Sequence, residues 1–204
     1  MSAIKIHQDD LPMGLDLGTE VAIDTETMGL NINRDKLCLV QLQGNIDSTV
    51  HIVRFTNDYN APNLGQLLIN ENIVKIFHFA RFDVAVLLKY LNVLTANIYC
   101  TKIASKLVRT YTSSHGLKDL CLDLLGITLN KEMQQSNWGK KEISDAQLQY
   151  AAQDVVYLHK LKAALTPLLQ EYKREGIAKS CFQFMVTRAF LDILGWSEED
   201  IFKH

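Results

Sequence analysis

The sequence has little of what usually divides or crosslinks a chain. Its 204 residues include only 3 prolines, 10 glycines and 4 cysteines, so no Pro- or Gly-rich linker separates it into parts. The cysteines stand far apart in apolar surroundings, with no Cys-x-x-Cys pair and no nearby cluster of histidines. This spacing excludes a zinc motif and predicts buried free thiols. We expect a single domain over residues 1–204.

Long hydrophobic runs are also missing. The first ten residues, MSAIKIHQDD, lack the apolar segment of a signal peptide, and the apolar stretch 177–196 is interrupted by Lys179, Arg188 and Asp192. We therefore expect a soluble, cytoplasmic protein. The formal net charge of -2 provides no global attraction for nucleic acid. Binding of a polyanion must then depend on a local patch.

The apolar patterning predicts strands first, then strands alternating with helices, then helices alone. The first three strands are expected at 21–27, 36–42 and 49–55, and the short turn between the last two indicates an antiparallel start. After them we expect a helix at 62–69, a strand at 73–79, a helix at 80–91, a short strand at 97–100 and a helix at 101–108. Further helices are expected at 117–126, about 144–172 and 180–195. This order predicts an α/β fold with a mixed sheet, helices on both faces and a helical C-terminal part.

Acidic side chains occupy unusual places in this pattern. Asp24 and Glu26 follow three apolar residues at the end of the first predicted strand, and side chains two apart share a face, roughly 6.5–7 Å apart. Asp83 lies in the first turn of a helix that follows a strand, where the helix dipole favours an acid and where α/β sheets place ligands. Taken singly, each acid also fits a solvated strand end or a helix terminus.

Tyr150 and Asp154 are one helical turn apart in YAAQDVVYLHKL, and the apolar spacing of that stretch turns their face inward. A buried carboxylate needs a partner, because losing water without one costs several kcal/mol. Four carboxylates with no accompanying Cys or clustered His are an all-oxygen ligand set, which favours Mg²⁺ or Mn²⁺ over zinc. Asp24, Glu26, Asp83 and Asp154 are therefore the candidate ligands of two divalent ions, the usual apparatus for phosphodiester cleavage.

The motifs IDTETMGL, HFARFD and LQYAAQDVVYL resemble, in order, the three exonuclease motifs of the DEDD superfamily. The tyrosine four residues before the last Asp makes the third motif similar to that of the tyrosine-bearing branch of this superfamily, which includes ribonuclease D. The segment between the second and third motifs, HGLKDLCLDLLGITLNKEMQQSNWG, is similar to the segment that connects them in ribonuclease D. KIFHFARFD, CTKIASKLVRTYT and the ending CFQF to LDILGWSEEDIF resemble the short bacterial enzymes called nano-RNase C. The resemblance implies a ribonuclease H-like fold and one 3′-5′ exonuclease domain, without accessory RNA-binding domains.

The resemblance also implies roles for individual residues. Asp24, Glu26, Asp83 and Asp154 would hold the two ions, and Tyr150 would orient the attacking water. The product would be a nucleoside 5′-monophosphate. Less specific expectations concern the substrate: Leu30 as a wedge against bases, His78, Phe79 and Phe82 lining the nucleotide pocket beside Thr25, and Lys102, Ser105 and Arg109 holding a terminal phosphate.

Several alternatives remain open. A haloacid dehalogenase-type phosphatase also begins with an acidic motif after a strand, but it gives no reason for Tyr150 with Asp154. A catalytically silent nucleic-acid-binding module would be expected to have lost a carboxylate, and all four are present. A proofreading DNA exonuclease shares the ions and usually has His at the position of Tyr150. Within the ribonuclease D branch, the substrates expected are short single-stranded RNA or dinucleotides, with DNA or longer structured RNA as alternatives.

The C-terminal run is richer in aromatic residues than one small domain readily covers; it contains Phe182, Phe184, Phe190, Trp196 and Phe202. This predicts a homo-oligomer, although the same residues would also serve to complete the core of one subunit. The resemblance to nano-RNase C implies a closed ring of eight subunits.

Overall fold

The structure is a computed structural model of the chain that describes residues 3–56, 58–129, 136–140 and 142–204. Residues 130–135, which belong to the connection quoted above, therefore lie outside the described residues. In the described part, the strands are β1 (Ile4–Gln8), β2 (Glu20–Thr27), β3 (Leu37–Gly44), β4 (Val50–Arg54), β5 (Val74–Phe77) and β6 (Ile98–Cys100). They form one six-stranded sheet in the order β1-β4-β3-β2-β5-β6.

The sheet is mixed, as the patterning predicts. Strands β2, β3 and β4 pair antiparallel, whereas β1 runs parallel to β4, and β5 and β6 continue parallel to β2. The edge strand β1 was not predicted, because IKIHQ is mostly exposed and lacks the apolar signal of the inner strands. Strand β2 lies at the centre of the sheet, and its register with β3 shifts between Glu26 and Thr27. Such irregularities often redirect side chains beside functional sites.

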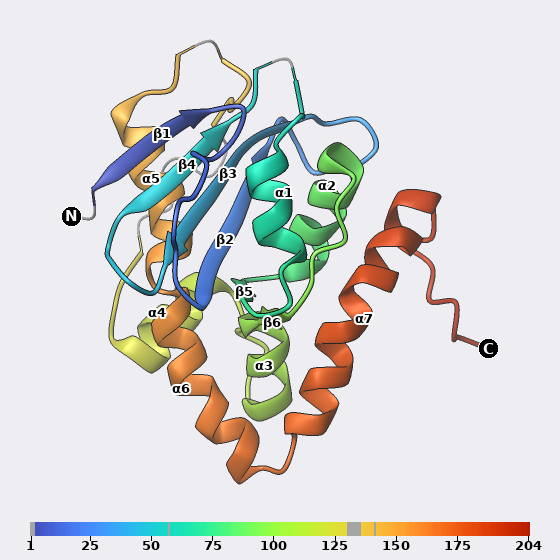
Figure 1. The fold of residues 1–204 in the computed structure, drawn as a ribbon. Helices are drawn as coiled ribbons and strands as arrows, with labels where there is room; N and C mark the ends of the chain where they lie inside the picture. The colour runs from blue at the N-terminus through green and yellow to red at the C-terminus, as the bar shows by residue number, and fades with distance from the viewer. Residues whose placement is uncertain (1–2, 57, 130–135, 141) are drawn as a thin grey trace.

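Helices cover both faces of the sheet (Figure 1). They are α1 (Pro62–Ile69), α2 (Ala80–Leu91), α3 (Thr101–Val108), α4 (Leu117–Leu125), α5 (Asp145–Val156), α6 (Leu158–Glu171) and α7 (Glu175–Leu194). Helices α1 and α2 lie on one face and α5 on the other, where α5 contacts β2, β3 and β4. The helices expected at 62–69, 80–91 and 101–108 have the predicted bounds.

The long C-terminal helical region differs from the prediction in two respects. Helix α7, expected at 180–195, begins at Glu175 and ends at Leu194. The segment expected as one helix from about 144 to 172 forms two, because α5 ends at Val156 and α6 begins at Leu158. Helix α5 starts at a capping box in which the Ser144 hydroxyl accepts from the Gln147 backbone N–H. The break turns the chain, so that α5 lies along the sheet while α6 leads away from it in Figure 1.

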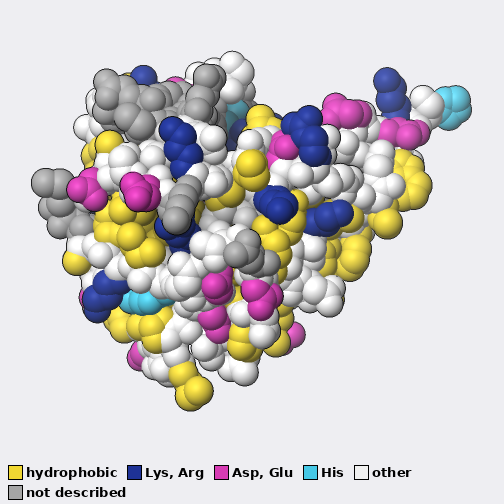
Figure 2. All heavy atoms as spheres, turned by 90° about the horizontal axis from the view of Figure 1, so that it is seen from above, with side chains coloured by type: hydrophobic (Ala, Val, Ile, Leu, Met, Phe, Trp, Pro, Cys, Tyr) yellow, Lys and Arg dark blue, Asp and Glu magenta, His cyan; other side chains and the backbone are white. Residues whose placement is uncertain are grey.

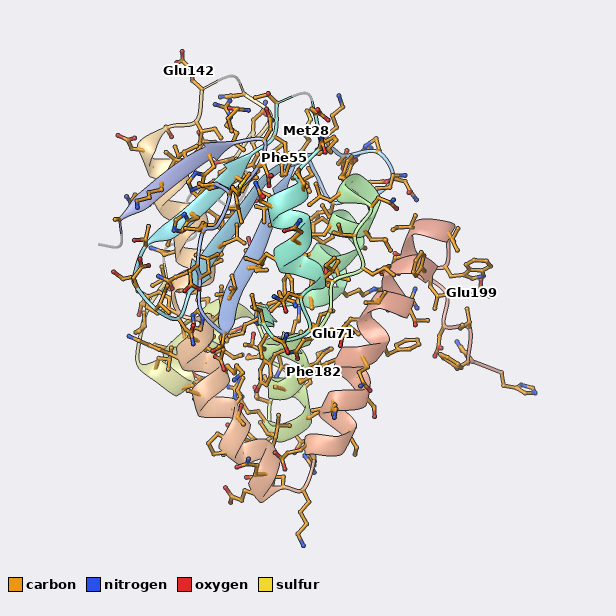
Figure 3. All side chains as sticks on the ribbon, viewed as in Figure 1. Met28, Phe55, Glu71, Glu142, Phe182 and Glu199 are labelled. Carbon is orange, nitrogen blue, oxygen red and sulfur yellow. The ribbon has the colours of Figure 1, made fainter. Side chains whose placement is uncertain are left out.

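The core consists of the apolar side chains of the inner strands and of the helix faces that cover them. Cys38, Cys100 and Cys121 are buried free thiols, as expected, and Cys181 is half-buried. None of the described helices has both the length and the hydropathy of a membrane span. The N-terminal part of α7 packs inward through Phe182, labelled in Figure 3, whereas the segment after α7, with Glu199, leads away from the body.

Candidate active site

The carboxyl end of β2 is where the predicted acids meet. One carboxylate oxygen from each of Asp24, Glu26 and Asp154 lies within 4.8 Å of the other two. Asp24 and Glu26 come from β2, and Asp154 comes from the last turns of α5, which packs on β2. Segments more than a hundred residues apart in the sequence therefore supply one acidic cluster.

Asp83 approaches the same cluster from α2. It is buried in the first turn of that helix, and its Oδ1 accepts a hydrogen bond of 2.7 Å from the Thr25 hydroxyl. Because neighbouring side chains on a strand point to opposite faces, β2 directs Thr25 to the α2 face and its neighbours Asp24 and Glu26 to the α5 face. The central strand thus joins acids supplied by helices on both faces of the sheet.

The acids raise one another's pKa. Burial is the largest cause for each of the four: it raises the pKa of Asp24 well above its usual value, with further rises from Asp83, Asp154 and Glu26. The pKa of Glu26 rises to about 9 through burial and then through Asp154 and Asp83. The pKa of Asp154 rises to about 7 through burial and Asp83. Burial likewise raises the pKa of Asp83 to about 7, against the hydrogen bond from Thr25, which lowers it.

Such a cluster cannot ionise fully without added positive charge. No described Lys or Arg is paired with any of the four acids. An all-carboxylate set of this kind matches the ligand preferences of Mg²⁺ and Mn²⁺. The donor set present therefore fits divalent cations at this place.

Tyr150 lies beside the cluster on the same face of α5 as Asp154. Its ring is half-buried and lies 6.2 Å from the Trp138 ring, centroid to centroid. Burial, followed by Asp154, Glu26 and Asp24, raises the pKa of the phenol far above its ordinary value of 10. The Tyr150 hydroxyl therefore keeps its proton at neutral pH, which suits a hydrogen-bonding role and not that of a base.

These residues line a cavity of about 740 Å³. The predicted substrate residues Thr25, Leu30, His78, Phe79, Phe82 and Lys102 also line it, together with all five predicted catalytic residues. The structure thus brings together side chains from β2, α2, α3 and α5 in one concave site. A volume of this size is in the range of small-ligand pockets.

The loop after β2 places Leu30 at this cavity with 85% of its surface exposed. Buried Asp35 fixes the loop by accepting a 2.9 Å hydrogen bond from the Asn31 backbone N–H. Gly29 is required there, because a Cβ at its position would stand 2.3 Å from an Asp35 carboxylate oxygen. Leu30 thus presents an apolar surface at the edge of the cavity, where a ligand can contact it.

The turn between β5 and α2 also contributes to the wall of the cavity. Phe79 adopts a left-handed backbone conformation with φ of 69° and remains 44% exposed. That conformation costs a non-glycine residue on the order of 1 kcal/mol, and such strain is concentrated at functional sites. The Lys102 ammonium stands 4.1 Å from the Phe79 ring centroid. The pair presents an aromatic ring and a cation to the cavity.

Two of the predicted substrate residues do not reach the cavity. Arg109 is buried, and its guanidinium pairs with Asp123 and donates to the Ser114 carbonyl at 2.9 Å. Ser105 is also buried, and its hydroxyl lies 2.9 Å from His115 Nδ1. Their helical spacing reflects internal packing of α3 against the following loop. The expectation that these two residues hold a terminal phosphate is therefore not supported.

Other lining residues were not singled out from the sequence. They include Met28, Leu117, Leu129 and Trp138. Trp138 is 3% exposed, and a Cβ on its neighbour Gly139 would lie 3.1 Å from the Met28 side chain, so this loop packs closely beside β2. Nothing in the local pattern of SNWG indicates this contact.

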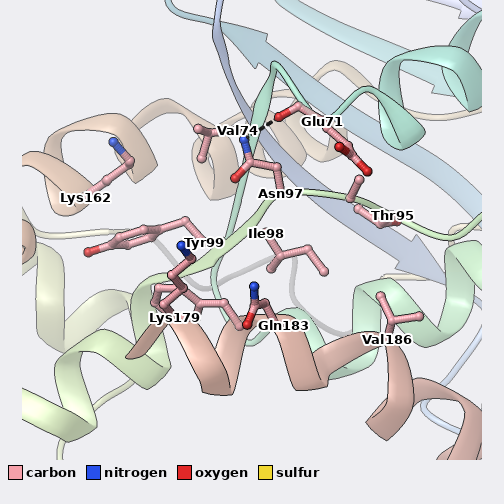
Figure 4. Close-up of a pocket in the computed structure, with 12 residues that line it drawn as sticks. Glu71, Val74, Thr95, Asn97, Ile98, Tyr99, Lys162, Lys179, Gln183 and Val186 are labelled. Carbon is pink, nitrogen blue, oxygen red and sulfur yellow. Dashed lines mark hydrogen bonds between the residues drawn. The ribbon is translucent and has the colours of Figure 1, made fainter. Parts of the chain in front are cut away.

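The face of the molecule seen from above carries mixed charge among the residues that the structure describes. In the view of Figure 2, basic, acidic and hydrophobic side chains are interspersed on the visible face, in keeping with the net charge of -2. A second cavity, of about 680 Å³, lies between β6 and α7 (Figure 4). Its lining includes one acid, Glu71, alongside Lys162 and Lys179. The acidic cluster thus distinguishes the first cavity from the second.

Residues 6–170 match the family model described as 3′-5′ exonuclease. The chain belongs to this family. Ribonuclease D of Gluconacetobacter diazotrophicus is 33% identical over 156 residues, which cover 76% of this chain and 38% of that protein. The chain thus spans about two fifths of the length of the curated relative.

Solved structures place this 3′-5′ exonuclease more closely. The structure of Brucella melitensis NrnC bound to pGG is similar with a TM-score of 0.95 and 48% identity, covering 100% of both chains. The structure of the same protein with bound Mg²⁺ has a TM-score of 0.93 and 47% identity over 99% of both chains. The chain is therefore a DEDD exonuclease of the ribonuclease D and NrnC type. The family and the ribonuclease H-like fold predicted from the motifs are confirmed.

Proposed function

We propose that the protein is a 3′-5′ exoribonuclease that hydrolyses short RNA oligonucleotides, including dinucleotides, to nucleoside 5′-monophosphates with the help of two divalent ions. The observation that carries this proposal is the convergence of Asp24, Glu26 and Asp154 in a cavity that also contains Asp83 and Tyr150. NrnC bound to pGG shares the whole fold at 48% identity.

Asp24, Glu26, Asp83 and Asp154 are the proposed ligands of Mg²⁺ or Mn²⁺. The NrnC structure with bound Mg²⁺ supports a divalent ion in a chain of this type. When bound, the ions supply the positive charge that neutralises the scissile phosphate and lowers the pKa of the attacking water. The Thr25 hydroxyl orients Asp83 and favours its ionised form, so Thr25 acts as a positioning residue.

Tyr150 is proposed to act on the water. Its hydroxyl stays protonated beside the carboxylates and is fixed by the packing of its ring near Trp138. A hydroxyl held in this way can orient the water for in-line attack on the terminal phosphodiester. The proton that the water releases balances the proton that the leaving 3′ oxygen takes up from solvent, and Tyr150 keeps its own proton throughout. Cleavage of the P–O3′ bond then leaves the phosphate on the departing nucleotide as a 5′-monophosphate.

Leu30, Phe79, Phe82 and Lys102 are proposed to hold the nucleotides. Leu30 and Phe79 are exposed and apolar, so each offers a surface on which a base can stack or wedge without reading its identity. Lys102 adds a cation at the cavity wall. Contacts of this sort lie close to the acids, so they contribute as much binding energy for a short substrate as for a long one.

Two other functions remain as alternatives. Ribonuclease D-like processing of longer structured RNA and exonuclease action on DNA would use the same acids. The mixed charge around the visible face argues against a long polyanion track and favours short RNA. We expect residues 1–204 to act as one exonuclease domain in the cytoplasm.

We also propose a homo-oligomer, in the form of a closed ring of eight subunits. Phe182 completes the subunit's own core by packing on Tyr99, with 4.9 Å between ring centroids. Farther along, Phe190, Trp196 and Phe202 are 44%, 41% and 78% exposed. The segment that carries the last two leads away from the body (Figure 1), which suits burial against another copy.

Graded substrates test the proposed function. The purified protein is incubated with Mg²⁺ and end-labelled RNA and DNA, from dinucleotides to strands of about twenty nucleotides, and every product is resolved. We expect kcat/KM on a 5′-phosphorylated diribonucleotide to equal or exceed that on the long strand, and weaker binding once the 5′ phosphate is removed. Digestion of the long strand that leaves dinucleotides intact would favour ribonuclease D-like processing, and preference for DNA would overturn the assignment to RNA.

A further inference from the structure

His78 takes part in a chain of hydrogen bonds that defines its protonation. The Thr101 hydroxyl lies 3.1 Å from the Phe77 carbonyl oxygen and 2.9 Å from His78 Nδ1. A carbonyl oxygen accepts only, so the single proton of the Thr101 hydroxyl is donated to Phe77. The Thr101 oxygen must then accept from the other side, and the donor is the Nδ1–H of His78.

The second ring nitrogen of His78 is therefore left without a proton. Burial, and after it the nearby Lys102 ammonium, lower the pKa of His78 to about 3, so the imidazole is neutral. In a neutral imidazole with Nδ1 protonated, Nε2 is an acceptor only. His78 lines the active-site cavity, and no hydrogen bond joins its Nε2 to another described residue.

An acceptor at this place discriminates among the groups of a nucleotide. Phosphate oxygens also accept only, so Nε2 cannot bind them. A ribose hydroxyl can donate to it, and so can an exocyclic amino group of some bases. An exonuclease that removes nucleotides in succession needs contacts that every nucleotide offers, and the sugar hydroxyls are common to all four ribonucleotides, whereas the amino groups are not.

We propose that His78 Nε2 accepts a hydrogen bond from a hydroxyl of the 3′-terminal ribose, and that Thr101 is the positioning residue that holds His78 in the required tautomer. This inference rests on the proposed function and deepens it, because it assigns recognition of the terminal sugar to one atom of the cavity. The neighbouring acids, when ionised, accept hydrogen bonds and do not donate them. The substrate must therefore supply the donors for its contacts with this part of the cavity, and the ribose hydroxyls are such donors.

The test combines two substitutions of His78 with three substrates. His78→Phe keeps a ring but removes both nitrogens, and His78→Gln retains an acceptor. Each is assayed on a 5′-phosphorylated diribonucleotide and on the same molecule lacking either the 2′ or the 3′ hydroxyl of its terminal sugar. For the wild type we expect kcat/KM to fall about 3- to 10-fold when the recognised hydroxyl is removed, the contribution of one neutral hydrogen bond.

On the full ribose substrate, kcat/KM of His78→Phe should be lower than that of the wild type by the same factor. On the substrate that lacks the recognised hydroxyl, kcat/KM of His78→Phe should equal that of the wild type. His78→Gln should have a kcat/KM on the full substrate between those of the wild type and His78→Phe. The deoxy substrate that shows this pattern identifies the hydroxyl. Equal losses on all three substrates, or none, would overturn the inference. If His78→Phe does not fold, the comparison is made with His78→Gln and His78→Asn, which differ in the reach of their acceptor.

Nitrogen NMR of the wild-type protein provides a readout independent of turnover. We expect the Nδ1–H tautomer for His78 and a mixture of tautomers in Thr101→Val, whereas an Nε2–H tautomer in the wild type would overturn the inference. Cleavage of the unmodified dinucleotide by the wild type tests the proposed function separately. If no cleavage occurs, that function fails, and calorimetric binding of the same three dinucleotides still decides the role of His78.

Discussion

Replacing Asp154 with asparagine should have opposite effects on the metal-free protein and on its response to Mg²⁺. In the absence of metal, Asp154 shares a half-buried cluster with Asp24 and Glu26, and no described cation compensates the charge. The asparagine side chain has nearly the same shape as that of aspartate and carries no charge. We therefore expect Asp154→Asn to stabilise the metal-free fold while it weakens the binding of divalent ions.

The size of the effect follows from the pKa of Asp154, which burial and Asp83 raise from 3.8 to about 7. Because the folded pKa lies above the unfolded one, the folded state holds its proton over this range, and metal-free stability falls as pH rises from about 4 to about 7. Keeping such a group ionised at pH 8 costs roughly 4 kcal/mol. Since the four acids share the repulsion, we expect Asp154→Asn to recover about 2–4 kcal/mol, or roughly 5–15 °C in Tm.

The assay is thermal unfolding in EDTA at pH 5 and pH 8, at fixed protein concentration, followed by titration with Mg²⁺. The Tm of the wild type should be lower at pH 8 than at pH 5 and should rise strongly when Mg²⁺ is added. For Asp154→Asn, both the decrease in Tm with pH and the rise in Tm with Mg²⁺ should be smaller. Asp145→Asn, an exposed acid in the first turn of the same helix, is the matched control and should change Tm little. A lower Tm for Asp154→Asn than for the wild type in EDTA at pH 8 would refute the reasoning.

Three further predictions concern the residue proposed to orient the water, a buried amide in the sheet and the proposed oligomer. Tyr150→Phe should retain the Mg²⁺-induced rise in Tm and lose at least tenfold in kcat, since only the hydroxyl beside the acids is removed; an unchanged kcat in steady-state assays would exclude Tyr150 from the mechanism. Gln41→Leu should stabilise the protein by about 1 kcal/mol in urea unfolding, because neither amide atom of this fully buried side chain has a partner in the described part of the chain; a loss of stability would contradict this. Trp196→Ala combined with Phe202→Ala should lower the mass measured by light scattering at micromolar concentration, whereas Tyr111→Ala, equally an exposed aromatic at 80%, should not; a wild type that is already monomeric would refute the oligomer.

Most of the helices and strands could be predicted from the sequence alone. Helices α1, α2 and α3 were predictable to the residue, because apolar periodicity and the change from β-branched to helix-forming residues mark their ends. The acids were predictable for a different reason. A carboxylate in an apolar helix face or at the end of a buried strand has a high cost, so its presence indicates a partner before any contact is known.

Other features depended on long-range packing. Strand β1 has a weak local signal and exists because β4 offers it an edge to pair with. Ser105 and Arg109 have the spacing of a phosphate site, but both are buried, because the loop that follows α3 supplies His115 as a partner of Ser105 and α4 supplies Asp123 as a partner of Arg109. Helical spacing indicates which side chains share a face of the helix, but it does not indicate which other residues that face contacts.

The sequence by itself determined which residues carry the chemistry, since the carboxylates, the tyrosine and their local settings are properties of short segments. Only the tertiary structure decided how they combine. It brought Asp83 and Asp154 from opposite faces of the sheet to the end of β2, placed Trp138 beside Tyr150, and set Thr101 between Phe77 and His78. The physical reason is that proximity between distant segments arises from burial of the whole apolar core, to which every element contributes and which no local pattern encodes.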